Sequence, residues 1–247
     1  MGKTRASKRR RKNEEENEEK QAVEAKNTKL DTEKVGAAKN NNKSPVVVFA
    51  HGAGAPSTSD WMIRWKELLA KALGAVEVIT FDYPHLSGGK KRAPPKAEKL
   101  VAFHSDIIKK AVVKYPEHPL VLVGKSMGSR VSCMVAGSED IHASAVVCLG
   151  YPLKGMKGAI RDDTLLQLKV PTMFVQGSKD ALCPLDKLKV VREKMTSVSE
   201  LYVIEGGDHS FKIGKKHLQL EESSQEEADE CAANAISNFI SRLMEGR

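Results

Sequence analysis

The chain alternates short apolar runs with longer segments in which apolar residues recur every three or four positions. Short apolar runs bounded by turn residues are typical of buried strands, and the longer period is typical of amphipathic helices. Because strands and helices alternate, we expect a parallel sheet covered by helices on both faces, an α/β fold of three layers. The predicted strands are Val46–Ala50, Val76–Phe81, Leu120–Gly124, Ala145–Leu149, Thr172–Gln176 and Glu200–Ile204.

Three segments have apolar residues at helical spacing. The first is residues 97–115, and the second follows Pro184. The third opens with Ser223-Ser224-Gln225-Glu226, which has the pattern of a capping box. The residues expected on the buried faces are Leu100, Phe103, Ile107 and Ala111 in the first helix, Leu188, Val191 and Met195 in the second, and Ala228, Cys231, Ala235, Phe239 and Leu243 in the third.

The sheet is expected to be minimal and its site open. No antiparallel strand pair precedes Val46, so about six strands are predicted. Only 22 residues separate Leu149 from Thr172, too few for a large lid domain. An open, shallow site suits small or flexible substrates better than long buried acyl chains.

Residues 1–43 differ from the remainder in composition. They contain 13 Lys or Arg and 8 Asp or Glu, so their net +5 supplies most of the chain's +8. Such a segment buries too little apolar surface to offset the entropy of ordering it. We therefore predict a disordered charged tail at residues 1–43 and one domain at residues 44–247. The basic cluster Lys8-Arg9-Arg10-Arg11-Lys12 is either a nuclear-import or nucleic-acid-binding signal or part of a solubilising tail.

The strand ending at Gly124 runs into Gly124-Lys125-Ser126-Met127-Gly128, and a helix-prone segment follows. A Gly-x-Ser-x-Gly sequence between a strand and a helix is the sequence form of a nucleophile elbow. Gly124 and Gly128 lack a Cβ, so strand and helix can approach closely. Ser126 is the candidate nucleophile, and the backbone N–H of Met127 is a candidate oxyanion donor.

A serine nucleophile needs a base, and the base needs an acid that orients it. Asp180 follows the strand Thr172–Gln176, and His209 follows the strand Glu200–Ile204. The order Ser, Asp, His is that of α/β hydrolases, and both residues fall at the strand ends where ligand sites form. Asp180 is the expected acid, rather than Asp208, which directly precedes His209 in the chain.

The first strand opens into His51-Gly52-Ala53-Gly54, a loop whose glycines allow it to turn over the nucleophile. One of its N–H groups is expected to be the second oxyanion donor, with Ala53 as first choice and Gly54 as second. His51 precedes Ser126 in the chain, so it is interpreted as a loop-shaping residue rather than a base.

Other reactive residue types have simpler interpretations. Cys133, Cys148 and Cys231 are expected in the core, and Cys183 in a loop near the site. No Cys or His spacing predicts a metal site. His85 is either a residue that borders the pocket or a core residue. Three basic groups are expected at the sheet's C-terminal edge, where they could attract an acidic substrate or be solvated: Lys90-Lys91-Arg92, then Lys154, Lys157 and Arg161, and Lys125.

The motifs together carry a resemblance to a known family. From about residue 44 to 247 the chain resembles the α/β-hydrolase superfamily. Within it, HGAGAP, GKSMGSR, LGYPLK, PTMFVQGSKD and IEGGDHSF resemble the small hydrolases grouped with testis-expressed protein thirty and the hydrolase-like domain of NSL histone-acetyltransferase complex subunit three. The resemblance implies a triad of Ser126, Asp180 and His209, and an oxyanion hole of Met127 with the His51–Gly54 loop. It implies no particular substrate.

The sequence therefore predicts a soluble serine hydrolase that cleaves an ester or related acyl bond through an acyl-enzyme and without a cofactor. The alternative is a scaffold of the same fold in a nuclear, chromatin-associated complex. The expected partners are a small acyl or ester substrate, which could be acidic, and a protein complex; nucleic acid would bind at most weakly, through the basic tail. Unpaired thiols, and the absence of a signal peptide or a long apolar run, favour the nucleus or cytoplasm over secretion or a membrane.

Overall fold

The computed structural model describes residues 43–90, 92–155 and 158–245, and these form the domain considered below. The predicted tail falls almost entirely on residues 1–42, outside the described residues, and it stays a prediction.

The domain is built on one parallel sheet of six strands in the order β2-β1-β3-β4-β5-β6. The predicted strands are all present, with ends shifted by at most one residue. Four of them, β1, β3, β4 and β5, are buried along their whole length, which explains their unbroken apolar sequences. The strand bounds are β1 Val46–Ala50, β2 Glu77–Phe81, β3 Leu120–Lys125, β4 Ala145–Leu149, β5 Thr172–Gly177 and β6 Ser199–Ile204.

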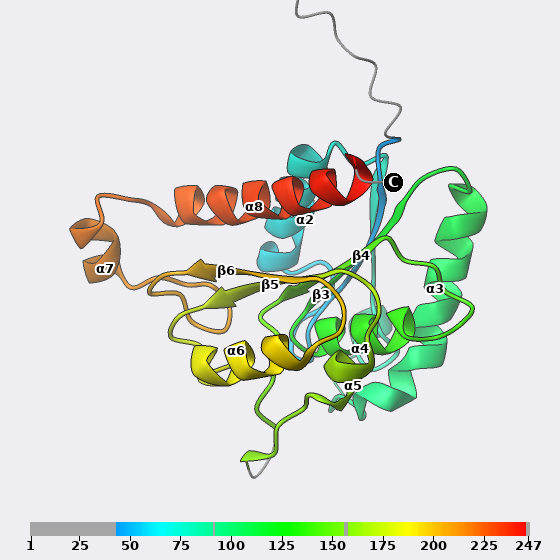
Figure 1. Cartoon of the computed structure of the whole chain (residues 1–247), viewed down its shortest axis with the longest axis horizontal. Coiled ribbons are helices and arrows are strands. Elements are labelled where there is room, and N and C mark those ends of the chain that lie inside the picture. The colour runs from blue at the N-terminus through cyan, green and yellow to red at the C-terminus, as the bar shows by residue number, and fades with distance from the viewer. Residues whose placement is uncertain (1–42, 91, 156–157, 246–247) are drawn as a thin grey trace, which may run out of the picture. The chain divides into compact units, whose positions relative to one another are not determined.

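Helices cover both faces of this sheet (Figure 1). Alternate residues of β1 show the division, because Val48 packs into the core shared with α3, α4, α5 and α6, whereas Val47 packs into the core shared with α2 and α8. The predicted three-layer α/β fold is therefore confirmed. The helix bounds are α2 Asp60–Leu73, η1 Ser87–Gly89, η2 Ala97–Leu100, α3 Val101–Lys114, α4 Met127–Ala136, α5 Asp163–Gln167, α6 Leu185–Lys194, α7 Lys215–Leu220 and α8 Gln225–Glu245.

The strand order creates a topological switch point between β1 and β3. From β1 the chain crosses to β2 on one side and then returns to β3 on the other side. At such a switch point the loops after neighbouring strands diverge, and ligands bind beyond the carboxyl ends of the strands. The loops that carry the predicted site residues all leave from the carboxyl ends of the strands.

Two details of α8 differ from the prediction. The capping box is formed by Ser224 and Glu227, one residue later than expected: Ser224 Oγ accepts the Glu227 N–H at 3.1 Å, and Glu227 Oε2 accepts the Ser224 N–H at 2.9 Å. The buried stripe is rotated as well, because α8 packs against α2 and β6 together. Phe239 is buried as predicted, but Cys231 is exposed. The residues buried on α8 are Asp229, Ala232, Ala233, Ile236, Phe239, Ile240 and Met244.

The buried face of α3 is shifted in the same way. Leu100 and Ala111 are buried as predicted, but Phe103 and Ile107 are only partly buried. The deepest positions are instead Ile108 and His104. A histidine does not contribute to an apolar pattern, so the helical periodicity does not indicate that His104 is buried.

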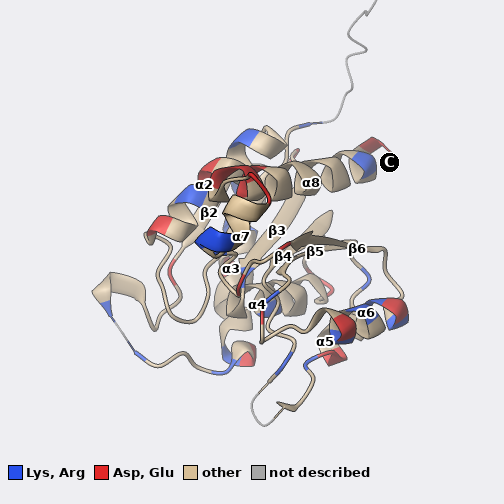
Figure 2. Ribbon diagram, turned by 90° about the vertical axis from the view of Figure 1, so that its left-hand side faces the viewer, with Lys and Arg blue, Asp and Glu red and all other residues tan. Residues whose placement is uncertain are grey.

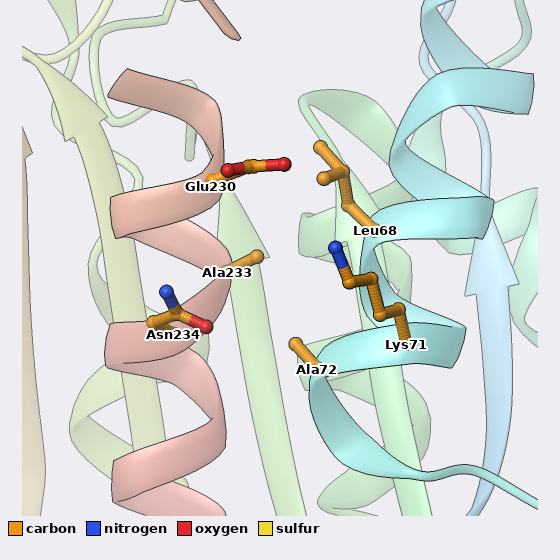
Figure 3. A pocket seen from close by; sticks show the side chains of 6 residues that line it. All are labelled: Leu68, Lys71, Ala72, Glu230, Ala233 and Asn234. Carbon is orange, nitrogen blue, oxygen red and sulfur yellow. The ribbon is translucent and has the colours of Figure 1, made fainter. Parts of the chain in front are cut away.

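The described part of the β4–β5 connection contains no lid domain. It holds one isolated antiparallel bridge, Lys154 to Ile160, and the short helix α5. Within the described residues, no helix is both long and apolar enough to cross a bilayer. A shallow groove of about 240 Å³ lies between α2 and α8 (Figure 3). None of its lining residues belongs to the predicted site; they are Leu68, Lys71, Ala72, Glu230, Ala233 and Asn234.

Candidate active site

Ser126 occupies the turn between β3 and α4. Its φ of 51° and ψ of −114° cost a residue with a side chain on the order of 1–3 kcal/mol. Two glycines make the turn possible. A Cβ on Gly124 would stand 2.3 Å from the Ser129 nitrogen, and a Cβ on Gly128 would stand 2.5 Å from the Ala50 oxygen. The start of α4 is therefore too close to β3 for a larger residue at Gly124, and too close to the end of β1 for a larger residue at Gly128.

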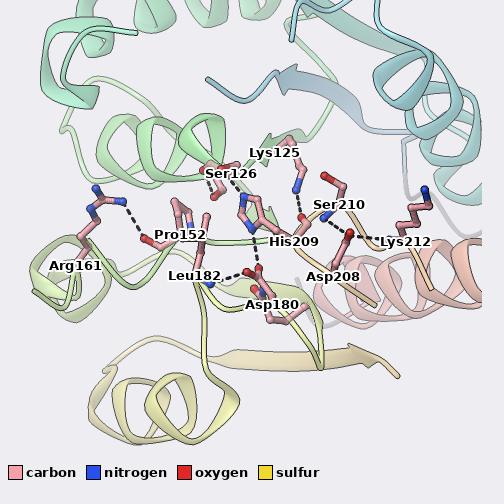
Figure 4. A network of polar contacts seen from close by, with 12 residues as sticks. Lys125, Ser126, Pro152, Arg161, Asp180, Leu182, Asp208, His209, Ser210 and Lys212 are labelled. Carbon is pink, nitrogen blue, oxygen red and sulfur yellow. Dashed lines mark hydrogen bonds and ion pairs between the residues drawn. The ribbon is translucent and has the colours of Figure 1, made fainter. Parts of the chain in front are cut away.

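Ser126, His209 and Asp180 form a continuous chain of hydrogen bonds (Figure 4). His209 Nε2 lies 2.8 Å from Ser126 Oγ, and His209 Nδ1 lies 2.7 Å from Asp180 Oδ2. The imidazole is 27 % exposed, whereas the Asp180 side chain is fully buried. The fold thus brings together three residues that leave the sheet after β3, β5 and β6.

The Asp180 carboxylate is held on both of its oxygens. Oδ1 accepts the Leu182 N–H at 2.8 Å, and Oδ2 accepts hydrogen bonds from Gln176 Nε2 and His209 Nδ1. Burial raises the pKa of Asp180, but its hydrogen bond and charge interaction with His209, the Leu182 N–H and the charge of Lys125 outweigh burial and lower that pKa. Asp180 is therefore ionised at neutral pH and can balance a charged imidazole.

Asp208, the neighbour of His209, has a different role. Its Oδ1 accepts the N–H groups of Ser210 at 2.7 Å and Lys212 at 3.0 Å, so it braces the loop that carries the imidazole. Within the described residues, it makes no hydrogen bond to the His209 ring. The geometry expected of a triad acid is thus found at Asp180.

Two backbone N–H groups, those of Met127 and Ala53, have no hydrogen-bond acceptor among the described residues. The N–H of Met127 starts α4, where no carbonyl of the same helix can accept it. The Ala53 N–H likewise donates to no described residue. The Gly52 carbonyl accepts a 2.5 Å hydrogen bond from His51 Nδ1. The peptide group that joins Gly52 to Ala53 is trans, so the Ala53 N–H points away from the His51 ring.

The rings of His51 and His85 both contact backbone carbonyls of the His51–Gly54 loop. His51 is fully buried, and its Nε2 accepts the Tyr83 N–H at 2.9 Å. Burial lowers the pKa of His51, which keeps the ring neutral. Because Nδ1 faces a carbonyl and Nε2 accepts an N–H, the ring proton is on Nδ1. His85 is also buried, with Nε2 3.3 Å from the Ala53 oxygen. Of its two interpretations the core position is the observed one, although His85 contacts the loop directly.

A cleft of about 550 Å³ opens beside the His51–Gly54 loop, the predicted oxyanion loop, and includes Ala53 and Gly54 in its wall. Its apolar surface comes from residues such as Leu86 and Pro94, and two cations, Lys90 and Arg92, line it as well. The remaining lining residues are Pro56, Thr58, Asp82, Gly89 and Ala93.

The other basic residues expected at this edge are placed differently. Lys91 and Lys157 lie outside the described residues. Arg161 donates to the Pro152 carbonyl at 3.3 Å, which holds its own loop. Lys125 is buried, so neither of its two interpretations, a solvated lysine or one that attracts an acidic substrate, is right.

Sequence reasoning missed several contacts that support the site. The sequence indicates Gln176 only as the end of a strand, but its Nε2 donates to Asp180 Oδ2. No motif includes Trp61, but its Nε1 donates to the Ser210 carbonyl at 2.9 Å. Both are long-range or side-chain contacts that leave no periodic signal in the sequence. Among the described residues, no three His, Cys, Asp or Glu side chains gather closely enough to bind a metal ion.

Comparison with known proteins supports the same fold. A family described as an alpha/beta hydrolase domain matches residues 43–241. The esterase Pf2001 of Pyrococcus furiosus is similar with a TM-score of 0.60 and 19 % identity, over 82 % of this chain and 84 % of that one. A dienelactone hydrolase from Anabaena variabilis is similar with a TM-score of 0.58 and 17 % identity, over 82 % and 88 % of the two chains.

A monoacylglycerol lipase from Paleococcus ferrophilus has a TM-score of 0.58 and 16 % identity, over 80 % of this chain and 97 % of that one. At such identities the likeness shows the fold alone. The family match is stronger because it covers most of the described domain. The chain therefore belongs to the alpha/beta hydrolase family.

Proposed function

We propose that this protein is a serine hydrolase that cleaves an ester or a related acyl bond. The observation that carries the proposal is the unbroken hydrogen-bond chain from Asp180 through His209 to Ser126, with distances of 2.7 and 2.8 Å. Ser126 is held in a strained turn, and the N–H groups of Met127 and Ala53 have no acceptor among the described residues. A scaffold has no physical need of all these features together.

The chemistry follows from the geometry. His209 Nε2 takes the proton of Ser126 Oγ as the oxygen attacks the substrate carbonyl. The N–H groups of Met127 and Ala53 then stabilise the oxyanion of the tetrahedral intermediate. His209 returns the proton to the leaving alcohol, the C–O bond breaks, and an acyl-enzyme remains. Water, deprotonated by His209, releases the acid by the same route, while Asp180 keeps the imidazole proton on Nδ1.

A fluorophosphonate probe tests the nucleophile. Wild-type protein is expected to be labelled, and Ser126→Ala is expected to lose labelling with a nearly unchanged melting temperature. The matched control is Ser210→Ala, which removes an exposed serine hydroxyl next to His209. Equal labelling of wild type and Ser126→Ala would show that the nucleophile has been misassigned.

We further propose that the substrate carries a negative charge. The cleft beside the oxyanion loop is lined by Lys90 and Arg92, and neither cation lies within 4.0 Å of a carboxylate among the described residues. Among the described residues that line the cleft, Asp82 is the one acid, and it accepts the Ser57 N–H at 2.7 Å. An ester with a carboxylate on its acyl or alcohol part would pair with the two free cations.

Matched esters test this charge preference. Lys90→Gln combined with Arg92→Gln is expected to lower kcat/KM for a nitrophenyl half-ester of glutarate about fivefold, since an exposed ion pair is worth about 1 kcal/mol or less. The rate with neutral nitrophenyl butyrate should not change, and Lys154→Gln serves as the control on another loop. An equal fall with both esters would rule out charge recognition.

The narrower grouping with testis-expressed protein thirty, and a nuclear or cytoplasmic location, are also proposals. The grouping rests on the sequence motifs. The location is supported by the thiols of Cys133 and Cys148, which stay free with sulfurs 3.5 Å apart, as a reducing compartment allows.

On α2 and α6 basic and acidic residues are interspersed (Figure 2), so these helices offer no uniformly basic surface to nucleic acid.

A further inference from the structure

Lys125 is the last residue of β3 and directly precedes Ser126. Lys125 is only 8 % exposed, so its ammonium group lies inside the protein rather than at the mouth of the site. A buried ammonium costs several kcal/mol unless its charge and its protons are compensated. The surroundings of this group therefore indicate what it does.

The Lys125 ammonium group contacts the loop that carries the imidazole and lies beside two aromatic rings, Trp61 of α2 and Phe211 of that loop. Nζ donates a hydrogen bond to the His209 carbonyl (Figure 4) and lies 5.2 Å from the ring centroids of both Trp61 and Phe211. Burial lowers the pKa of Lys125 to about 8, against the charges of Asp180 and Asp208, which raise it. A methionine of similar length would fill the same space without that cost, so packing alone does not require a lysine.

Gly150 leaves the room that this contact needs. Its φ is 67°, and a Cβ there would stand 3.0 Å from both the His209 oxygen and the Lys125 Nζ. The loop after β6, which carries His209 and is called the histidine loop below, is also held at the next residue, because Trp61 Nε1 donates to the Ser210 carbonyl. Two successive carbonyls of the histidine loop thus accept hydrogen bonds from side chains of β3 and α2.

We propose that Lys125 is a positioning residue, which fixes the His209 carbonyl and thereby holds the imidazole in line between Ser126 and Asp180. The proposal rests on the function proposed above. The imidazole must meet one partner at each ring nitrogen, at 2.7 and 2.8 Å, so a small shift of its backbone weakens both hydrogen bonds. A misplacement of about 1 Å at a catalytic group can cost about 10²-fold in rate.

Lys125→Met tests the proposal because it keeps the length and the apolar stem and removes only the donor and the charge. Lys212→Met is the matched control, since Lys212 lies on the same loop with an exposed side chain. We expect Lys125→Met to fold, to keep KM for a neutral ester, and to react with a fluorophosphonate roughly 10- to 100-fold more slowly than wild type. The control should react at the wild-type rate.

Proton NMR supplies a readout that a purely structural role would not change. The downfield Nδ1–H resonance of His209, which reports its hydrogen bond to Asp180, should broaden or vanish in Lys125→Met well below the melting temperature. A sharp resonance together with wild-type labelling would overturn the proposal, as would an equal loss in Lys212→Met. If Lys125→Met does not fold, Lys125→Gln supplies the second test, because its shorter side chain moves the donor away from the His209 carbonyl, and labelling at the wild-type rate would then overturn the proposal.

The two proposals can fail separately. If wild-type protein is not labelled at all, the proposed hydrolase function fails, whereas the His209 resonance still shows whether Lys125 positions the ring.

Discussion

Replacing Asp180 with Asn changes one atom and leaves the shape of the buried site intact. The Leu182 N–H donates to Oδ1 at 2.8 Å, and because a backbone N–H cannot turn round, the oxygen of the new amide must take this position. The amide NH₂ then faces Gln176 and His209. Gln176 can accept it by rotating its own amide, since its Oε1 is buried and makes no hydrogen bond to any described residue.

His209 can adapt only by accepting the new N–H on Nδ1. Its proton then moves to Nε2, the nitrogen 2.8 Å from Ser126 Oγ, and the imidazole can no longer take the serine proton. The charge that stabilises the imidazolium is lost as well. We expect turnover to fall about 10⁴-fold, or about 5.4 kcal/mol of transition-state stabilisation. Stability should change little, because every polar group in the pocket keeps a partner.

Asp208→Asn is the matched comparison. The new amide oxygen can still accept the N–H groups of Ser210 and Lys212, so the loop keeps both hydrogen bonds and loses the carboxylate charge, which also acts on Lys125. We expect a change of about 1 kcal/mol in stability and a small effect on turnover. Steady-state hydrolysis of a neutral nitrophenyl ester, with thermal melting as the fold control, measures both variants. If Asp208→Asn proves the more damaging, Asp180 is not the triad acid.

Two further predictions concern the tail and the core. A chain that begins at Asn42 should match the full chain in melting temperature and turnover, because residues 1–41 carry little apolar surface to bury; a drop of many degrees would mean that they pack on the domain. Burial lowers the pKa of His104 to about 3, below the 6.5 of an unfolded chain, so protonation favours unfolding as the pH falls below 6.5. Between pH 7 and pH 5 this histidine should therefore lower the free energy of unfolding by about 2 kcal/mol. Urea unfolding of His104→Phe should lack that part of the pH dependence. An identical pH dependence in both proteins would contradict the lowered pKa of His104.

How well each element could be predicted depended on how many of its faces are covered. Strands such as β3 and β4 are buried on both faces, so every position must be apolar and the sequence marks them without ambiguity. A helix has only one buried stripe, and α8 offers several small residues in succession that suit more than one stripe. Its face was therefore decided by packing against α2 and β6, and Cys231 is exposed as a result.

The sequence by itself determined the six strands, the elbow at Ser126 and the order of Asp180 and His209. These are local requirements: glycines must flank a strained turn, and loops must follow strands. Only the tertiary structure decided where Lys125 points and that His85 contacts the Ala53 carbonyl. Such contacts join residues that are far apart in the chain. The sequence does not distinguish a lysine that reaches solvent from one that lies against aromatic rings. Its surroundings exist only once the sheet has brought β3, α2 and the histidine loop together.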